Sequence, residues 1–204
     1  MAKNRTPIVK LSRRLGIAIG KEHYVRRRPY PPGIHGPKYA RRRPRLSAYA
    51  EQLLEKQKAK AIYGIMEKQF RNYFDKASRH PDNTSEVLVR QLELRLDNVV
   101  YRLGFAKTRR QSRQMVGHRF FLVNDKPVDI PSYKMTIGDV ISFRESKKST
   151  GLVKQIAETM KLNPMPKWVS RDEKVLTGKV TSIPEGDDLD QPFDPTFIVE
   201  FYSR

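Results

Sequence analysis

The sequence predicts an α+β protein with three parts, and three observations support this prediction. The first 45 residues are dense in Arg, Pro and Gly, which indicates a basic extended arm. Residues 47 to 104 carry apolar side chains at three- and four-residue steps, which is the period of a helix. Residues 120 to 143 alternate apolar and polar between turn signals, which indicates short strands. We therefore expect an arm, a mainly helical domain and a small α+β module of two helices packed on a short antiparallel sheet.

The arm, residues 1–45, contains five prolines between positions 29 and 44, and these exclude a long helix. It has too little apolar material for a core of its own. Arginine offers planar donors to phosphate, and tyrosine offers a face on which unstacked bases stack. We interpret the arm as a polyanion-binding segment that becomes ordered with its partner, the alternative being a solvated basic tail. Its candidate binding residues are Arg13, Arg14, Arg26, Arg27, Arg28, Tyr30 and His35.

Residues 47 to 78 form the expected helical part. Ser47 is a candidate N-cap, and Gly64 is a candidate interruption after which Phe70 and Phe74 anchor a second helix. Basic side chains on these helices are expected to extend the positive surface, namely Lys56, Lys58, Lys68 and Arg71.

Residues 87 to 104 are expected to form one helix that ends at Gly104. Its apolar residues recur at helical spacing, at Leu88, Leu92, Leu96, Val99 and Leu103. Asp97 lies inside this pattern, so we expect it to act as a cap or to pair with a nearby arginine.

A short helix, a sheet and further elements are expected to follow. Thr108 starts the helix through a capping box with Gln111, and Gly117 ends it. Residues 120–124 and 126–130 form a hairpin, and residues 139–143 form a third strand. Beyond them we expect a helix over 150–162, a packing anchor at Trp168, and short strands within 174–183 and 196–203.

The short helix carries the main candidate site. On a helix, Arg109, Arg110 and Arg113 project within an arc of about 100°, while Met115 points to the core. Such a face suits phosphate oxygens, and a purely solvated charged face is the alternative. His118 has no Ser–His–acid or HExxH partner set, so we do not expect catalysis there. The flanking binding candidates are Lys107, His118, Arg119 and Lys126.

Charge and composition point to a nucleic-acid partner. The chain has 41 Lys or Arg against 22 Asp or Glu, a net charge of +19, which favours polyanions. The first 50 residues hold fourteen of these basic residues and one acid, whereas an acidic stretch from 185 to 200 is either a solvated loop or a protein contact. Without cysteine the chain has no disulfide and no Cys-ligated metal centre. No apolar run approaches the ~20 residues of a membrane span, so we expect a soluble cytoplasmic protein.

The stretch LELRLDNVVYRLGFAKTRRQSRQMVGHRFFLVNDKPVDIPSY resembles the S4 RNA-binding module. That module also occurs in pseudouridine synthases and in a tRNA synthetase. The flanking sequences, however, resemble the bacterial ribosomal protein S4 family over essentially the whole chain, through PGIHG, RRPRLSAY, EKQKAKAIYGIMEKQFRNYF and VEFYSR.

The resemblance implies a structural constituent of the small ribosomal subunit that binds the five-prime domain of small-subunit rRNA and nucleates assembly of the subunit body. It implies a place at the mRNA entry, with Arg42, Arg43 and Arg45 facing the messenger. It also implies contact with a neighbouring small-subunit protein that bears on translational accuracy. It further implies that the α+β module, residues 87–148, is inserted in a helical domain formed by 46–86 and completed by 149–204. Neither an enzymatic activity, nor a cofactor, nor a small-molecule substrate is expected.

The chain departs from the family pattern in two places. Many relatives carry four cysteines in the N-terminal segment, which bind zinc or an Fe–S cluster, and this chain has none, so we expect no metal. The module's hairpin usually turns on Asn-Gly, whereas Asn124-Asp125 is a poorer fit to two positive φ angles.

Two other functions remain open from the sequence. One is an RNA-modifying enzyme that carries the module as a targeting piece, because Arg95-Leu96-Asp97 resembles the catalytic aspartate motif of pseudouridine synthases. Against it, Asp97 lies inside the expected helix. The other is a free-standing regulator that binds its own messenger.

Overall fold

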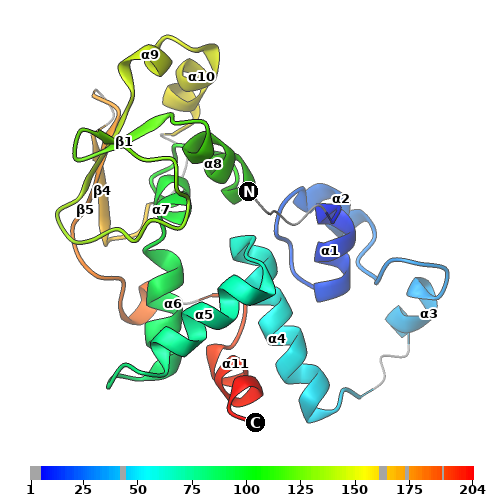
Figure 1. The fold of residues 1–204 in the computed structure, drawn as a ribbon. Coiled ribbons are helices and arrows are strands. Elements are labelled where there is room, and N and C mark those ends of the chain that lie inside the picture. Colours follow the sequence, from blue (N-terminus) through cyan, green and yellow to red (C-terminus); the bar gives the residue numbers. More distant parts are fainter. Residues whose placement is uncertain (1–5, 42–44, 161–164, 173–174, 190) are drawn as a thin grey trace. The chain divides into compact units, whose positions relative to one another are not determined.

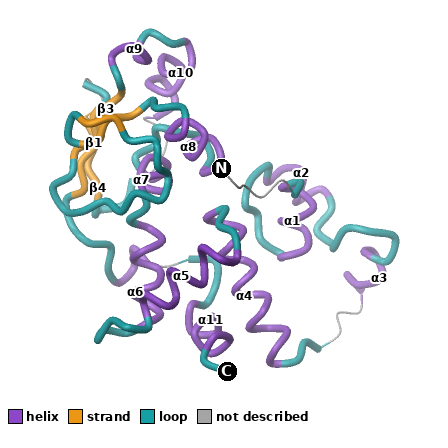
Figure 2. Tube along the Cα trace, in the orientation of Figure 1, coloured by secondary structure: helices purple, strands orange, loops and turns teal. Residues whose placement is uncertain are grey.

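Two compact units make up the chain (Figure 1). The structure, a computed structural model, describes residues 6–41, 45–160, 165–172, 175–189 and 191–204. The first unit contains residues 1–88 and 191–204, and the second contains residues 89–190. Helices dominate the first unit, and the second combines helices with an antiparallel sheet (Figure 2). The predicted α+β class is confirmed.

The arm contains three short helices, so it is less extended than predicted. These are α1 (Ile8–Leu15), α2 (Glu22–Arg27) and α3 (Gly36–Arg41). Gly16, at a φ of 70°, ends α1 in the left-handed conformation that glycine adopts without strain. The proline-rich stretch after α2 prevents a longer helix, as expected.

Arg13 of α1 clamps that proline-rich stretch. Its Nε donates to the carbonyl oxygen of Tyr30 at 2.9 Å, and a terminal nitrogen donates to the carbonyl of Pro31 at 3.3 Å. The guanidinium also lies 4.9 Å from the centre of the Tyr30 ring, within cation–π range. Arg13 thus joins α1 to a segment 17 residues away.

Helices α4 (Ala48–Tyr63) and α5 (Glu67–Ala77) begin and end where the sequence indicates. The Ser47 hydroxyl accepts from the Ala50 amide at 3.3 Å, which caps α4. Gly64, at a φ of 64°, ends that helix. Both local signals are confirmed.

The C-terminal segment forms α11 (Pro195–Tyr202), and our prediction of a strand there was wrong. Pro195 stands at the start of the helix, and the Asp194 carboxylate accepts from the Thr196 amide at 2.8 Å. The run of β-branched and aromatic residues favours a strand, but its helical spacing places aromatic rings against α4 and α5. Tyr202 stacks on Phe74 with ring centres 4.7 Å apart, so tertiary packing overrides propensity.

Residues 87 to 104 form two helices, α6 (Thr84–Glu93) and α7 (Leu96–Arg102), where we had predicted one. Arg95 adopts an extended conformation at the break and forms an isolated β-bridge with Lys134. The backbone groups freed at the break are taken up by a distant segment. The Leu94 carbonyl accepts from the Met135 amide at 2.8 Å, and the Leu96 amide donates to the Tyr133 carbonyl at 2.9 Å.

The second unit contains a five-stranded antiparallel sheet in the order β2-β1-β3-β5-β4. Its strands are β1 (Phe121–Val123), β2 (Lys126–Pro127), β3 (Val140–Phe143), β4 (Val169–Asp172) and β5 (Thr177–Val180). Helices α8 (Arg109–Gly117), α9 (Glu145–Lys148) and α10 (Gly151–Thr159) and a 3₁₀ turn (Gly186–Leu189) complete the unit. The predicted hairpin, third strand and later helix are confirmed, while β4 and α9 were not predicted.

The hairpin turn has φ angles of 48° at Asn124 and 62° at Asp125, so the two positive angles of the Asn-Gly type are kept. The Asn124 side chain is held by Asp139 and by the Val140 amide at 2.9 and 3.0 Å. Burial raises the pKa of Asp139, but hydrogen bonds from Thr136 and Asn124 outweigh it and hold that pKa below its ordinary value.

The core of the second unit is aromatic at its centre. The rings of Phe105 and Phe121 each lie within about 5 Å of Phe143, with centre distances of 5.0 and 4.8 Å. Trp168 is fully buried in the same cluster, which confirms it as a packing anchor. Because β5 pairs with β3, the chain up to residue 190 belongs to this unit. Of the segment 149–204 that we assigned to the helical domain, only 191–204 lies in the first unit.

The clamp made by Arg13 can be tested by hydrogen exchange in the free protein. Arg13→Ala removes two hydrogen bonds, each worth about 1 kcal/mol, so amides within residues 22–36 should exchange up to roughly 30-fold faster. Arg14→Ala, an exposed neighbour on α1, is the matched control and should leave exchange unchanged. Exchange in Arg13→Ala equal to that of the wild type would show that the clamp does not order this segment.

Candidate nucleic-acid interface

Helix α8 brings the three predicted arginines together, but it does not expose them equally. Arg110 is exposed, while the side chains of Arg109 and Arg113 are only 21% and 22% exposed. The Nε of Arg109 donates to the Asn98 side-chain oxygen at 2.7 Å, and its guanidinium lies 4.5 Å from the Tyr101 ring centre. The predicted cap at Thr108 and the inward position of Met115 are confirmed.

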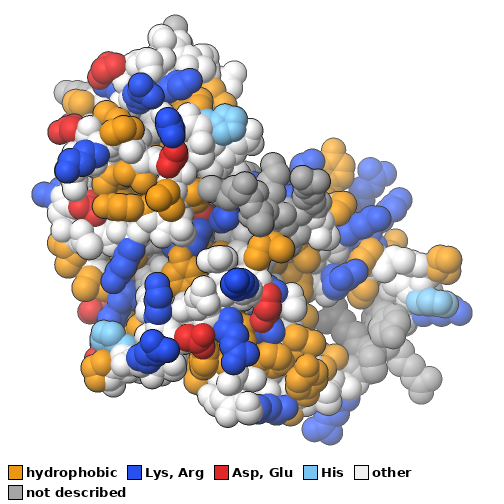
Figure 3. Space-filling model, in the orientation of Figure 1, with side chains coloured by type: hydrophobic (Ala, Val, Ile, Leu, Met, Phe, Trp, Pro, Cys, Tyr) orange, Lys and Arg blue, Asp and Glu red, His pale blue; other side chains and the backbone are white. Residues whose placement is uncertain are grey.

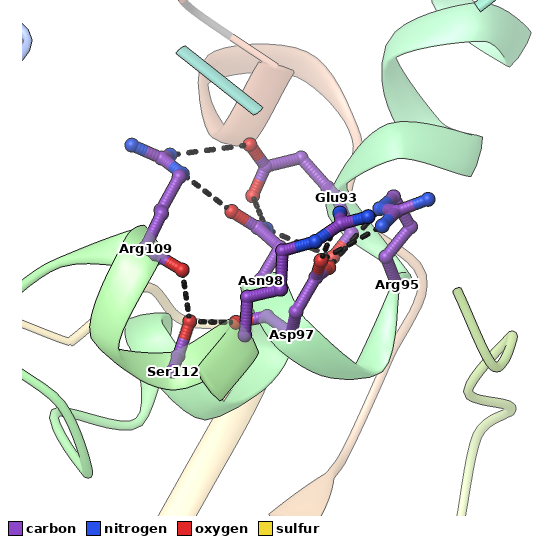
Figure 4. A network of polar contacts seen from close by, with 7 residues as sticks. Glu93, Arg95, Asp97, Asn98, Arg109 and Ser112 are labelled. Atoms are coloured by element: carbon purple, nitrogen blue, oxygen red, sulfur yellow. Dashed lines mark hydrogen bonds and ion pairs between the residues drawn. The ribbon is translucent and has the colours of Figure 1, made fainter. Parts of the chain in front are cut away.

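Glu93 is the first of two buried acids beneath this helix, with a side chain that is 0% exposed. Its two carboxylate oxygens each accept from Arg102 at 2.9 Å, in a bidentate pair. The Asn98 amide donates to the same carboxylate at 2.8 Å, and a terminal nitrogen of Arg109 lies 4.0 Å from it. Figure 4 shows Glu93, Asn98 and Arg109 pointing toward one another.

Asp97 is the second buried acid. Arg95 donates to both of its oxygens at 3.0 and 2.7 Å, and Arg113 donates to one of them at 3.2 Å. The Ser112 hydroxyl donates to the Asp97 backbone carbonyl at 2.6 Å, which fixes α8 against α7 (Figure 4). Pairing of Asp97 with nearby arginines, as expected, is confirmed. The Asp97 side chain is only 6% exposed.

The other candidates of this module lie on its surface. Lys107, His118 and Lys126 are exposed. Arg119, at a φ of 57°, is also exposed and pairs with Asp129 at 2.8 Å. These side chains are therefore accessible to a polyanion, and none of the described contacts gives His118 a catalytic partner.

The candidates of the helical part divide into two groups. Lys56 is buried, lies 3.0 Å from Glu67 and sits 4.0 Å above the Phe201 ring. Lys58 pairs with Glu55 at 2.6 Å and is largely covered. These two lysines hold the unit together and do not project from it as we expected. Lys68 and Arg71 are exposed, as predicted for a binding surface.

Glu67 is the centre of the cluster that holds α11. Its carboxylate accepts from Lys56, from Lys60 and from the Tyr202 hydroxyl, the last at 2.7 Å. Burial raises the pKa of Glu67, but hydrogen bonds from Lys60, Tyr202 and Lys56 outweigh it and lower that pKa to about 2. Burial and the bond to Glu67 raise the pKa of Tyr202 above its ordinary value.

The arm presents most of its predicted residues to solvent. Arg14, Arg27, Arg28 and His35 are exposed, and Arg26 is exposed while pairing with Glu22 at 2.6 Å. Basic side chains cover much of the arm's visible surface (Figure 3). Arg13 and the partly buried Tyr30 instead contact each other. Of the residues expected at the mRNA entry, Arg45 is exposed, whereas Arg42 and Arg43 lie outside the described residues.

The residues present do not fit a metal centre of the kind that the family resemblance implies for some members. The chain has no cysteine. Among the described residues, no group of three or more His, Asp or Glu side chains is placed to hold a metal ion. None of the described helices is long and apolar enough to cross a membrane.

Sequence reasoning missed Glu93, Arg95, Asn98 and Arg102 as parts of the site. The one available signal is composition, because two acids and five arginines fall between 93 and 113. Their spacing does not place them on one face of a single helix. The break at Arg95 is what brings them together.

The role of Glu67 predicts a specific pH dependence of stability. The group's pKa is 4.5 when unperturbed and about 2 in the folded protein. Its stabilisation is therefore present above pH 4.5 and is lost as the pH falls toward about 2. In urea unfolding between these pH values, Glu67→Gln should lose less free energy of unfolding than the wild type, while the exposed acid change Glu51→Gln should follow the wild type. Parallel curves for Glu67→Gln and the wild type would contradict this role.

In a comparison with known proteins, two family models match consecutive parts of the chain. A family model described as the Ribosomal protein S4/S9 N-terminal domain matches residues 3–93, and one described as the S4 domain matches residues 94–141. The chain is 47% identical over 205 residues to the small ribosomal subunit protein uS4 of Persephonella marina, and the match covers 100% of both chains. It is 47% identical to the uS4 protein of Aquifex aeolicus and 45% identical to that of Thermus thermophilus, each over 97% of both chains.

Proposed function

The chain belongs to the family of small ribosomal subunit protein uS4, and from that premise we propose that it is a primary binder of small-subunit rRNA. It serves as a structural constituent of the small subunit, binds the five-prime domain of the rRNA and nucleates assembly of the subunit body. It is not an enzyme. The observation that carries this proposal is the identity of 47% over the complete length of both chains, arm included.

The distribution of charge supports an RNA partner. Structured RNA is recognised mainly through its shape, phosphates and 2′-hydroxyls, and the net charge of +19 suits such a target. Among the described residues, the exposed candidates for contact come from every part of the chain. They are Arg14, Arg26, Arg27, Arg28, His35, Lys68, Arg71, Lys107, Arg110, His118, Arg119 and Lys126.

The same proposal places the segment before α4 at the mRNA entry. It rests on the sequence RRRPRLS, in which Arg42, Arg43 and Arg45 are concentrated. Of these, Arg45 is described and exposed, so its guanidinium is accessible to a messenger phosphate. Contact with a neighbouring small-subunit protein gives the chain its influence on translational accuracy.

A salt titration tests the proposal directly. The purified chain is bound to the five-prime domain of small-subunit rRNA and, separately, to an unrelated folded RNA of equal length. We expect a preference of at least about tenfold, which is 1.4 kcal/mol, at physiological salt. If six to ten phosphates are neutralised, affinity should fall by roughly 10³ to 10⁵ between 50 and 200 mM salt.

Equal binding to both RNAs, lost together as salt rises, would contradict a specific role in the ribosome. Arg110→Ala should weaken binding and lower the slope of log affinity against log salt by about 1, as expected for the loss of one phosphate contact. The matched control is Arg144→Ala, an exposed arginine of the same unit that was not among the candidates, and it should change binding less.

A further inference from the structure

Two buried carboxylates lie directly beneath a helix that is proposed to bind a polyanion. Glu93 and Asp97 are both buried, and each is surrounded by arginines. Negative charge near an RNA-binding face repels phosphates, so on charge alone these acids weaken the proposed function. Their contacts with the arginines indicate a role that offsets this repulsion.

Three of the surrounding arginines are held from inside and remain partly open to solvent. Arg102 uses its Nε and one terminal nitrogen on Glu93, Arg109 uses its Nε on Asn98, and Arg113 uses one terminal nitrogen on Asp97. A guanidinium has five N–H donors, so one group can bind an internal acceptor and a phosphate at the same time. The side chains of Arg102, Arg109 and Arg113 are 25%, 21% and 22% exposed. Arg95, in contrast, is buried against Asp97.

The cluster keeps an excess of positive charge. Its four arginines face two carboxylates, so the arginines outnumber the acids by two. The carboxylates therefore orient the guanidinium groups without cancelling them. An arginine that is already fixed loses less side-chain freedom when it meets a phosphate, so more of the contact energy appears as affinity.

We propose that Glu93 and Asp97 are positioning residues, which hold the guanidinium groups of Arg102, Arg109 and Arg113 as a preorganised surface for RNA phosphates. This inference rests on the proposed function, because it takes RNA as the ligand. Asn98 extends the support, since it accepts from Arg109 while donating to Glu93. The two acids act through the arginines and do not touch RNA.

The proposal reverses the effect expected from net charge. Neutralising an acid in a polyanion-binding protein ordinarily raises affinity, because repulsion is removed. Neutralising a positioning acid instead releases the arginines, so affinity falls although the protein becomes more positive. The sign of the change therefore separates positioning from a purely structural ion pair.

The experiment compares two acid-to-amide changes in the full chain. Glu93→Gln removes one of the positioning carboxylates. Asp129→Asn is the matched control. This change also removes one negative charge, and Asp129 pairs with the exposed Arg119 of the same unit. Affinity for the five-prime-domain rRNA is measured for both at several salt concentrations. We expect Glu93→Gln to bind at least about fivefold more weakly than the wild type, and Asp129→Asn to bind equally or more tightly.

Binding by Glu93→Gln that equals or exceeds the wild type would overturn the proposal. Circular dichroism and the fluorescence of the single Trp168 report whether each variant is folded. If Glu93→Gln does not fold, Asp97→Asn replaces it in the experiment. Weaker binding by Asp97→Asn would support the proposal, and binding equal to or tighter than the wild type would overturn it. Loss of the fold in both variants would assign the acids a role in folding alone and would also overturn the proposal.

The outcomes also separate this inference from the proposed function. A wild-type chain without preference for the five-prime domain would contradict the proposed function itself. A wild-type chain with that preference, together with tight binding by a folded Glu93→Gln variant, would contradict only the positioning role.

Discussion

The second unit depends on the pairing of buried carboxylates with arginines. Glu93 ends α6 and Asp97 lies in the first turn of α7. The arginines that face them come from the break between these helices, from α7 and from α8. An unpaired carboxylate in this position would be strongly destabilising. The helices are therefore constrained to the arrangement in which Glu93 and Asp97 each meet a guanidinium, and this arrangement positions the arginines of α8.

The first unit uses the same principle with different residues. Glu67 joins Lys56, Lys60 and Tyr202, and through them it holds α11 against α4 and α5. Arg13 likewise stabilises the arm, by donating hydrogen bonds to backbone carbonyls. Of the 41 basic residues of the chain, some therefore stabilise the fold through internal contacts. Other basic side chains among the described residues are exposed in both units, and these are accessible to RNA.

Local signals in the sequence predicted local structure well. Ser47, Gly64 and Thr108 bound helices because each satisfies or ends a helix within its own turn. Long-range contacts account for what was missed. The break at Arg95 depends on backbone bonds to residues 133–135, and α11 depends on aromatic packing against α5. Arg109 and Arg113 were predicted as a free phosphate-binding face, and no helical wheel of α8 shows the acids that α6 and α7 place beneath it.

The central claim is that the arginines of the module are fixed before RNA arrives, and side-chain NMR of the free chain tests it most directly. The Nε–H groups of Arg95, Arg102 and Arg109 each donate to an internal acceptor. These groups should therefore exchange slowly with water and show restricted motion, whereas those of the exposed Arg14 and Arg28 should be mobile and exchange quickly. Equal mobility and equal exchange in the two groups of arginines would contradict the account.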